Sequence, residues 1–462
     1  MDPSIIFWTL FGINWAIFLF EQYLAWRQYK VHEKHEKRPD SLKDLLTKKN
    51  FILARRYKLD RGRFGFVSDV VTQIQTSIFV FGGFMHMAWE FVGQYTDSEI
   101  VQSAYFLVLT TLIDVVLSLP FGLYDTFVIE ERHGFNQQTL GFYFTDKAKK
   151  IALNLALTVP IVSAIIWFVK WGGDYFFFYL WLFISAIIFL LMTIYPEFIA
   201  PLFDKYVPLP DSELKVKIED LAKRVGFPLT KLYVVQGSKR SSHSNAYMYG
   251  FWNNKRIVLY DTLLSPETIV QLFGEPEKKP EPTQPKQEVD VSDSSEDEET
   301  SANSVKNRVG KGMTDDEVVA VLGHEIGHWR MKHTVIQLTI AEINLFFSLF
   351  FFAKLYQYQP LFDAFGFLGE TPTLIGLLLV FQLILAIYNE LFGIAQSFLS
   401  RRMEFDADKY SADLGYADAL GKALIKLGVD NLSLPIDDPI YSAVHHSHPP
   451  IPERIKALKK ST

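Results

Sequence analysis

The chain has 462 residues, of which 49% are hydrophobic and 15% aromatic, and it contains 40 Phe. Such a composition is typical of a protein that exposes much of its surface to lipid. Its formal net charge of -6 gives no overall basic field, so we expect no nucleic-acid partner. The chain has no cysteine, which excludes disulfides, thiolate zinc ligands and a cysteine nucleophile. Any metal site must therefore consist of histidine and carboxylate side chains.

Seven stretches are long and apolar enough to cross a bilayer as helices, because a hydrocarbon core of about 30 Å needs roughly 20 mainly apolar residues. The first, fifth and seventh are the clearest of the set 4–26, 74–95, 101–123, 150–171, 174–196, 336–358 and 372–393. The first has no Lys or Arg before it and no cleavage pattern after it, so it is expected to be a retained span. Charged residues in the second and third, and prolines in the third and fourth, are compatible with tilted or kinked helices.

The basic residues predict the orientation of these spans. Residues 27–63 contain 13 Lys and Arg, whereas the next loop, 96–100, contains none. Because basic loops stay on the cytosolic side, the first loop is assigned to the cytosol and the second to the lumen. Counting spans forward then assigns 124–149, 197–335 and 394–462 to the cytosol, with the N-terminus in the lumen.

The chain is thus expected to be an α-helical polytopic membrane protein with a small α+β segment on the cytosolic side. Residues 1–196 form a membrane region with about five spans, and residues 336–393 add two more. Residues 197–335 form the α+β segment, and residues 394–462 form a C-terminal helical region.

Within the α+β segment the periodicity predicts one helix and three strands. Leu214, Ile218, Leu221 and Val225 recur at helical spacing, and Gly226 ends the pattern. Strand composition marks Lys231–Gln236, Asn245–Phe251 and Lys255–Tyr260. The last two are expected to form a hairpin that turns at Asn253 and Asn254.

Residues 274–311 differ in kind, because Pro, Glu, Lys, Ser and Asp dominate them. Such a stretch cannot bury enough apolar surface to order itself. We expect a disordered loop here, and the sequence assigns no role to it.

A candidate metal-binding motif follows this loop. Thr314 and Glu317 form a capping box that predicts the start of a helix. His324 and His328 are four residues apart on that helix, so both imidazoles lie on one face and can share a tetrahedral ion. Glu325 lies beside them, where it can take a proton from metal-bound water. A chance His-Glu-x-x-His match is the alternative, and the capped helix start argues against it.

A catalytic zinc site usually has three protein ligands and one open position. Glu404, which follows the seventh stretch, is the expected third ligand. On a helix Asp408 shares its face, so Asp408 could hold a ligating histidine by its second ring nitrogen. His445, His446 and His448 are further side chains whose ring nitrogens could bind a metal. His333, five residues beyond His328, is expected to face away from the pair and to be structural.

With these residues the sequence resembles the type I CAAX prenyl proteases, which are multispanning zinc enzymes of the endoplasmic reticulum and inner nuclear membrane. The resemblance runs from the first span to the C-terminal region. It rests on the segments 130–136, 237–247, 323–329, 401–408 and 448–450. Met403 and Asp406 depart from what relatives tend to have, and the loop 274–311 is a variable insert.

The resemblance implies that His324, His328 and Glu404 bind one zinc ion and that Glu325 is the base and later the acid. It implies that His448 helps to hold the substrate or its oxyanion. It further implies a substrate-binding strand at Asn245, Ala246, Tyr247 and Met248. Seven helices would enclose a membrane chamber, and the enzyme would remove the last three residues of farnesylated CAAX proteins from the cytosolic side. A second, N-terminal cleavage stays open.

Two alternative functions are considered against the sequence. A membrane quality-control protease that clears stalled or misfolded polypeptides would use the same chemistry, so the sequence cannot separate it. A transporter or scaffold with a vestigial motif is the other, and the presence of both imidazoles, Glu325 and Glu404 argues against it.

Overall fold

The structure, a computed structural model, describes residues 1–461 except 242, 244, 251–253 and 275–311. Almost all of the expected disordered loop therefore lies outside the described residues. The strands are β1 (Tyr206–Pro208), β2 (Leu229–Val235), β3 (Ala246–Tyr249) and β4 (Lys255–Tyr260). The α-helices are α1 (Pro3–Lys34), α2 (Lys48–Val80), α3 (Phe84–Gly93), α4 (Glu99–Tyr124), α5 (Leu140–Trp171), α6 (Phe176–Ile194), α7 (Glu213–Val225), α8 (Pro266–Phe273), α9 (Asp315–Arg330), α10 (His333–Leu355), α11 (Gln359–Asp363), α12 (Thr373–Leu378), α13 (Ala386–Ser411), α14 (Ala417–Asp430), α15 (Pro439–His445) and α16 (Ile451–Ser461).

The prediction of about seven spans is confirmed. Among the described residues, five helices are long and apolar enough to cross a membrane, and two bent helix pairs raise the number to seven. The second span bends by 53° between α2 and α3, where Gly83 has a φ of 80° that a side chain would disfavour. The seventh span, which looked among the clearest, bends by 59° after the π-helical turn Leu379–Ile384. Pro120 and Pro160 instead lie inside uninterrupted helices.

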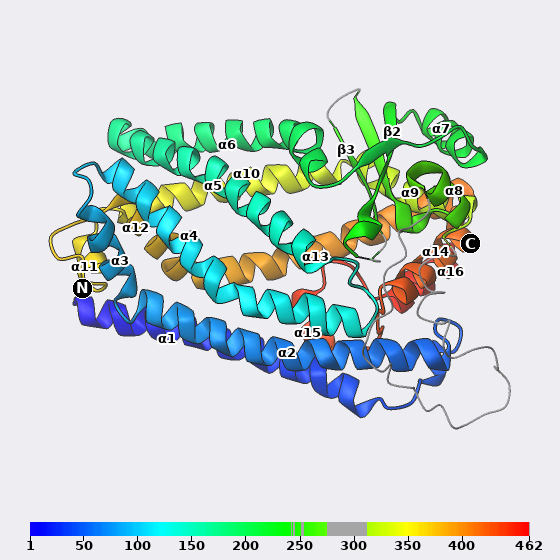
Figure 1. The fold of residues 1–462 in the computed structure, drawn as a ribbon, viewed down its shortest axis with the longest axis horizontal. Helices are drawn as coiled ribbons and strands as arrows, with labels where there is room; N and C mark the ends of the chain where they lie inside the picture. The colour runs from blue at the N-terminus through cyan, green and yellow to red at the C-terminus, as the bar shows by residue number, and fades with distance from the viewer. Residues whose placement is uncertain (242, 244, 251–253, 275–311, 462) are drawn as a thin grey trace.

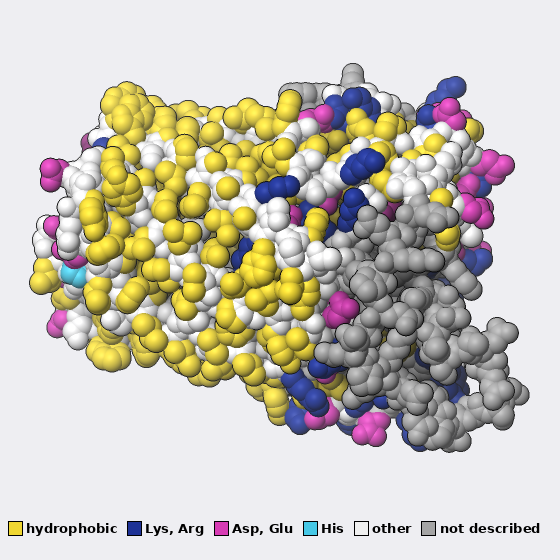
Figure 2. All heavy atoms as spheres, in the orientation of Figure 1, with side chains coloured by type: hydrophobic (Ala, Val, Ile, Leu, Met, Phe, Trp, Pro, Cys, Tyr) yellow, Lys and Arg dark blue, Asp and Glu magenta, His cyan; other side chains and the backbone are white. Residues whose placement is uncertain are grey.

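Few residues of the straight spans are fully buried. Only 6–17% of the apolar window of each straight span is buried, which fits helices arranged around a wide interior and not packed tightly against one another. In Figure 1, α1 and α2 run side by side along one edge of the molecule and α6 and α10 along the opposite edge. Figure 2 shows hydrophobic side chains over this helical region, as expected for a surface that faces lipid.

The sheet lies at one end of the helical region, near the C-terminus, and the N-terminus lies at the other end (Figure 1). Charged side chains gather at the sheet end in Figure 2. All four of the segments assigned to the cytosol make contacts there: Arg27 pairs with Asp438 at 2.8 Å, and Arg240 pairs with Asp146 at 2.7 Å. The segments grouped by counting spans therefore lie on the same side of the molecule.

The sheet has the strand order β1-β2-β4-β3, so β3 is an edge strand. β3 pairs with β4 in antiparallel fashion, with Ala246 opposite Leu259 and Met248 opposite Ile257. This pairing confirms the expected hairpin, although residues 251–253 of its turn lie outside the described residues. β2 and β4 are parallel, and the sequence missed β1, which has only three residues.

The helix that carries the histidine motif packs against this sheet through an apolar core. Ile218 of α7, Val234 of β2, Ile257 of β4 and Leu322 and Ile326 of α9 are fully buried in one cluster. Burial of each such side chain contributes about 1.5–3 kcal/mol. The predicted helix of the α+β segment is confirmed as α7, which Gly226 ends at a φ of 69°. The core therefore fixes α9 relative to the sheet edge.

Candidate metal centre

The helix α9 begins as the sequence predicts. The Thr314 side chain accepts a hydrogen bond from the Glu317 N–H, and the Glu317 side chain accepts one from the Thr314 N–H. Asp315 and Asp316 add negative charge to the first turn, which complements the positive end of the helix dipole. The cap fixes where α9 begins. Because its apolar face is buried in the core, its opposite face carries the polar side chains.

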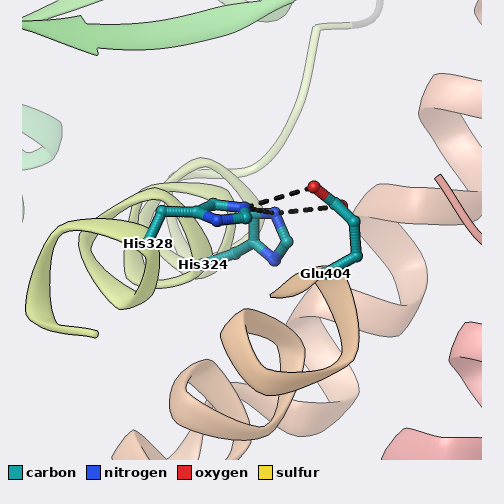
Figure 3. Close-up of side chains that lie close together, drawn as sticks. All are labelled: His324, His328 and Glu404. Carbon is teal, nitrogen blue, oxygen red and sulfur yellow. Dashed lines mark hydrogen bonds and ion pairs between the residues drawn. The ribbon is translucent and has the colours of Figure 1, made fainter. Parts of the chain in front are cut away.

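The two histidines of α9 point toward one another and toward Glu404 of α13 (Figure 3). His324 Nε2 and His328 Nε2 are 3.1 Å apart. Glu404 Oε2 lies 3.5 Å from His324 Nε2, and Glu404 Oε1 lies 3.3 Å from His328 Nε2. The structure thus brings together the three residues that the sequence nominated as ligands.

Two glycines of the motif allow α13 to approach α9 closely enough for this arrangement. A Cβ atom at Gly323 would lie 2.9 Å from Ser411 Oγ, and one at Gly327 would lie 3.1 Å from the Cα atom of Ala407. Ser411 also donates a hydrogen bond to the Ala320 carbonyl at 2.9 Å. A larger residue at either glycine would push Glu404 away from the imidazoles.

The donor set fits a divalent metal such as zinc. One atom from each of His324, His328 and Glu404 lies within 4.8 Å of the others, and two imidazoles with one carboxylate are a common set of zinc ligands. Glu404 is only 4% exposed, and its Oε2 atom is buried without a hydrogen-bond partner of acceptable geometry. A buried acceptor is costly unless something satisfies it, and a cation at this position would do so.

Glu325 lies between the two histidines in sequence and near them in space. Burial raises the pKa of the Glu325 carboxyl above its ordinary value, while the His324 and His328 rings act in the opposite direction. Its side chain therefore belongs to the same group of interacting residues.

Asp408, one helical turn beyond Glu404, lies where the sequence expects it. Its Oδ1 atom is 2.9 Å from His324 Nδ1, the ring nitrogen that faces away from His328. Arg454 of α16 holds the same carboxylate with two bonds, at 2.7 Å to Oδ2 and 2.6 Å to Oδ1. Asp408 is 1% exposed and Arg454 8% exposed, so this is a buried ion pair. The sequence offered no signal for Arg454.

His448 enters from the segment between α15 and α16. Its Nδ1 atom lies 2.8 Å from Glu404 Oε2, and its side chain is 66% exposed. The close contact with the Glu404 carboxylate raises the pKa of His448. His448 is therefore both in contact with the ligand group and open to an incoming molecule. His445 lies elsewhere, 3.2 Å from Glu21.

The expected substrate strand lies at the sheet edge beside α9. Ala246, Tyr247 and Met248 are in β3, and Asn245 precedes it, with its carbonyl accepting from the Tyr260 N–H at 3.0 Å. The Tyr247 hydroxyl lies 3.1 Å from that of Tyr206. Since β3 pairs only with β4 among the described strands, its other edge is free of a strand partner.

Two conspicuous sequence segments, 130–136 and 237–247, meet in the structure. The Phe135 and His243 rings stack with centroids 4.1 Å apart and an interplanar angle of 16°. His243 Nδ1 also lies 2.8 Å from Asn431 Oδ1, and Asn136 forms an isolated β-bridge with Ser241. These contacts hold the segment that leads into β3, a role that spacing alone did not indicate.

The expectation for His333 is wrong. Its ring does not face away from the motif, because His333 Nδ1 lies 2.9 Å from His328 Nδ1. A helical wheel extended from His328 places His333 on the opposite face, but α9 ends at Arg330 and a new helix begins at His333. The turn between the two helices, with Lys332 in a left-handed conformation, brings the side chain to the site.

The chain is similar to known proteins over its full length. Family models match residues 28–205 (CAAX prenyl protease N-terminal, five membrane helices) and residues 208–462 (peptidase family M48). A CAAX prenyl protease 1 homolog of Caenorhabditis elegans is 49% identical over 99% of this chain and 98% of its own, and one of Homo sapiens is 44% identical over 98% and 95%. The crystal structure of Ste24p from S. mikatae has a TM-score of 0.81 and 33% identity, and covers 99% of both chains. The chain therefore belongs to peptidase family M48, and within that family to the CAAX prenyl proteases.

Proposed function

We propose that the protein is a zinc-dependent membrane endopeptidase that removes the last three residues of farnesylated CAAX proteins. The observation that carries this proposal is the group formed by His324, His328 and Glu404, with Glu325 beside it, at the edge strand of a sheet that adjoins the membrane spans. The names of the relatives, CAAX prenyl protease 1 and its homologs, supply the substrate class.

In this proposal His324 Nε2, His328 Nε2 and one oxygen of Glu404 hold the zinc ion. When bound, zinc polarises the scissile carbonyl and lowers the pKa of the attacking water toward about 7. Glu325 would take a proton from the attacking water and later deliver it to the nitrogen of the leaving peptide. His448, which is exposed beside Glu404, donates to the carbonyl oxygen of the substrate as negative charge develops there.

The substrate peptide lies in extended form along β3. A peptide that adds to an exposed strand edge gains main-chain hydrogen bonds irrespective of its side chains. Asn245, Ala246, Tyr247 and Met248 offer such an edge next to α9. The contacts of Phe135 and His243 hold the preceding segment in place.

We further propose that the protein resides in the membrane of the endoplasmic reticulum and the inner nuclear membrane, with the site reached from the cytosol. The 13 Lys and Arg of residues 27–63 support this orientation, since that segment lies at the same end of the molecule as the sheet. Prenylated proteins are made in the cytosol, so their C-termini would reach the site without crossing the membrane.

The test uses purified protein and one CAAX peptide in farnesylated and unprenylated forms, with product masses measured. We expect the farnesylated peptide to lose its last three residues, the unprenylated peptide to be cut at least tenfold more slowly, and Glu325→Gln protein to be inactive on both. Equal cleavage of both peptides would instead support a general membrane quality-control protease. Cleavage at another bond would contradict the proposed reaction.

A further inference from the structure

His333 is a buried imidazole that touches one of the proposed ligands. It is 6% exposed, and its Nδ1 atom lies 2.9 Å from Nδ1 of His328. The two rings have centroids 5.1 Å apart and an interplanar angle of 69°. This contact uses the ring nitrogen of His328 that does not face His324 and Glu404.

The backbone that brings His333 to this place is strained. Only Met331 and Lys332 separate α9 from α10, and Lys332 has φ 58° and ψ 31°, in the left-handed region. For a residue with a side chain this conformation costs roughly 1–2 kcal/mol. Hydrogen bonds from Met331 N to Gly327 O and from Lys332 N to Trp329 O close the turn. This turn makes His333 the first residue of α10, next to the last turn of α9.

The proton count at this contact assigns a role to each ring. Two Nδ1 atoms at 2.9 Å need one proton between them, so one ring donates and the other accepts. If His328 presents the lone pair of Nε2 to a metal, its own proton must be on Nδ1, and His328 is the donor. His333 is then the acceptor, with its proton on Nε2.

The two proposed ligands are therefore supported differently. His324 donates its second N–H toward the Asp408 carboxylate, which Arg454 also holds, whereas His328 has a neutral imidazole as its partner. A partner on the second ring nitrogen fixes both the tautomer and the orientation of a ligating histidine. A neutral acceptor does so without adding another negative charge beside Glu404.

We propose that His333 is a positioning residue that holds His328 in the tautomer and orientation in which its Nε2 atom binds the metal. The inference rests on the proposed metal site, but it concerns metal affinity and not the identity of the substrate. It requires an acceptor at the position of His333 Nδ1, and not merely a side chain that fills the space.

The test compares three variants that separate these requirements. His333→Asn places an amide oxygen close to the position of Nδ1, His333→Leu is nearly the same size without an acceptor, and His333→Gln places its oxygen near the position of Nε2. Zinc affinity is measured by competition with a chromogenic chelator, and cobalt(II) spectra report the geometry of the site. Lys332→Gly serves as a control, since glycine accepts the left-handed backbone and leaves the acceptor in place.

We expect His333→Leu and His333→Gln to weaken zinc binding by about 10–100-fold, the range found for such partners. His333→Asn and Lys332→Gly should stay within about threefold of the wild-type protein. If Leu fails to fold, the comparison of Asn with Gln still decides the matter. Equal affinity in all three His333 variants, or equal losses in all three, would overturn the inference while leaving the proposed function intact. Absence of zinc binding by the wild-type protein would overturn both.

Discussion

Asp408 is expected to have two effects: it orients the proposed ligand His324, and it stabilises the fold through its buried ion pair with Arg454. Substitutions of Asp408 and Arg454 can distinguish the two effects. Asp408 contacts both His324 and Arg454, and all three side chains are buried. Arg454→Met leaves the carboxylate with the imidazole as its remaining partner. Removal of one member of a buried ion pair costs about 3–5 kcal/mol. The variant should therefore lose that much free energy of unfolding but keep the Asp408 contact that orients His324.

A double variant, Asp408→Leu with Arg454→Met, should have near-normal stability but weakened zinc binding. Both charges are gone and apolar groups of similar volume replace them, a change that is often neutral or stabilising. The free energy of unfolding should thus recover to within about 1 kcal/mol of the wild-type value. His324 Nδ1 now has no carboxylate to accept its proton, so zinc affinity should fall by about 10–100-fold, or about 1.4–2.7 kcal/mol.

The assay measures both quantities on detergent-solubilised protein. Chemical unfolding of the metal-free protein gives stability, and competition with a chelator gives zinc affinity. Arg454→Met should be unstable with nearly normal affinity, and the double variant should be stable with weak affinity. If the double variant binds zinc as tightly as Arg454→Met does, Asp408 serves only as the counter-ion of Arg454, and the reasoning is refuted.

Two further predictions concern the proposed base and the loop before α9. Glu325→Gln should retain zinc but lower turnover by about 10²–10⁴-fold, as measured by metal analysis and peptide cleavage, and near-normal activity would refute its role as the base. Deletion of residues 274–311 should leave peptide cleavage within about twofold, because none of the proposed site residues lies in that segment, and a folded but inactive deletion variant would contradict this.

The sequence predicted those features that depend on local chemistry. The capping box of Thr314 and Glu317, the strands that flank the turn near Asn254 and the end of α7 at Gly226 are all found as expected. The placement of Glu404 and Asp408 on one face followed from a four-residue spacing within a single helix, and the structure brings both to the histidines.

Features that depend on distant packing or on unusual backbone could not be predicted. Arg454 contacts Asp408, 46 residues away in sequence, and His324, 130 residues away. Contacts at such sequence separations produce no periodic pattern from which they could be predicted. His333 was misplaced because the left-handed turn at Lys332 carries no glycine or asparagine to announce it. The bend of the seventh span near Leu385 likewise lacks a proline or glycine at the break.

The central claim, that His324, His328 and Glu404 hold a zinc ion, is tested most directly by anomalous diffraction at the zinc edge from crystals of the protein. The account predicts one anomalous peak per chain, bonded to Nε2 of both histidines and to a carboxylate oxygen of Glu404. Zinc–nitrogen distances of about 2.0–2.1 Å are expected. Absence of a peak from zinc-loaded crystals, or a peak at other residues, would contradict it.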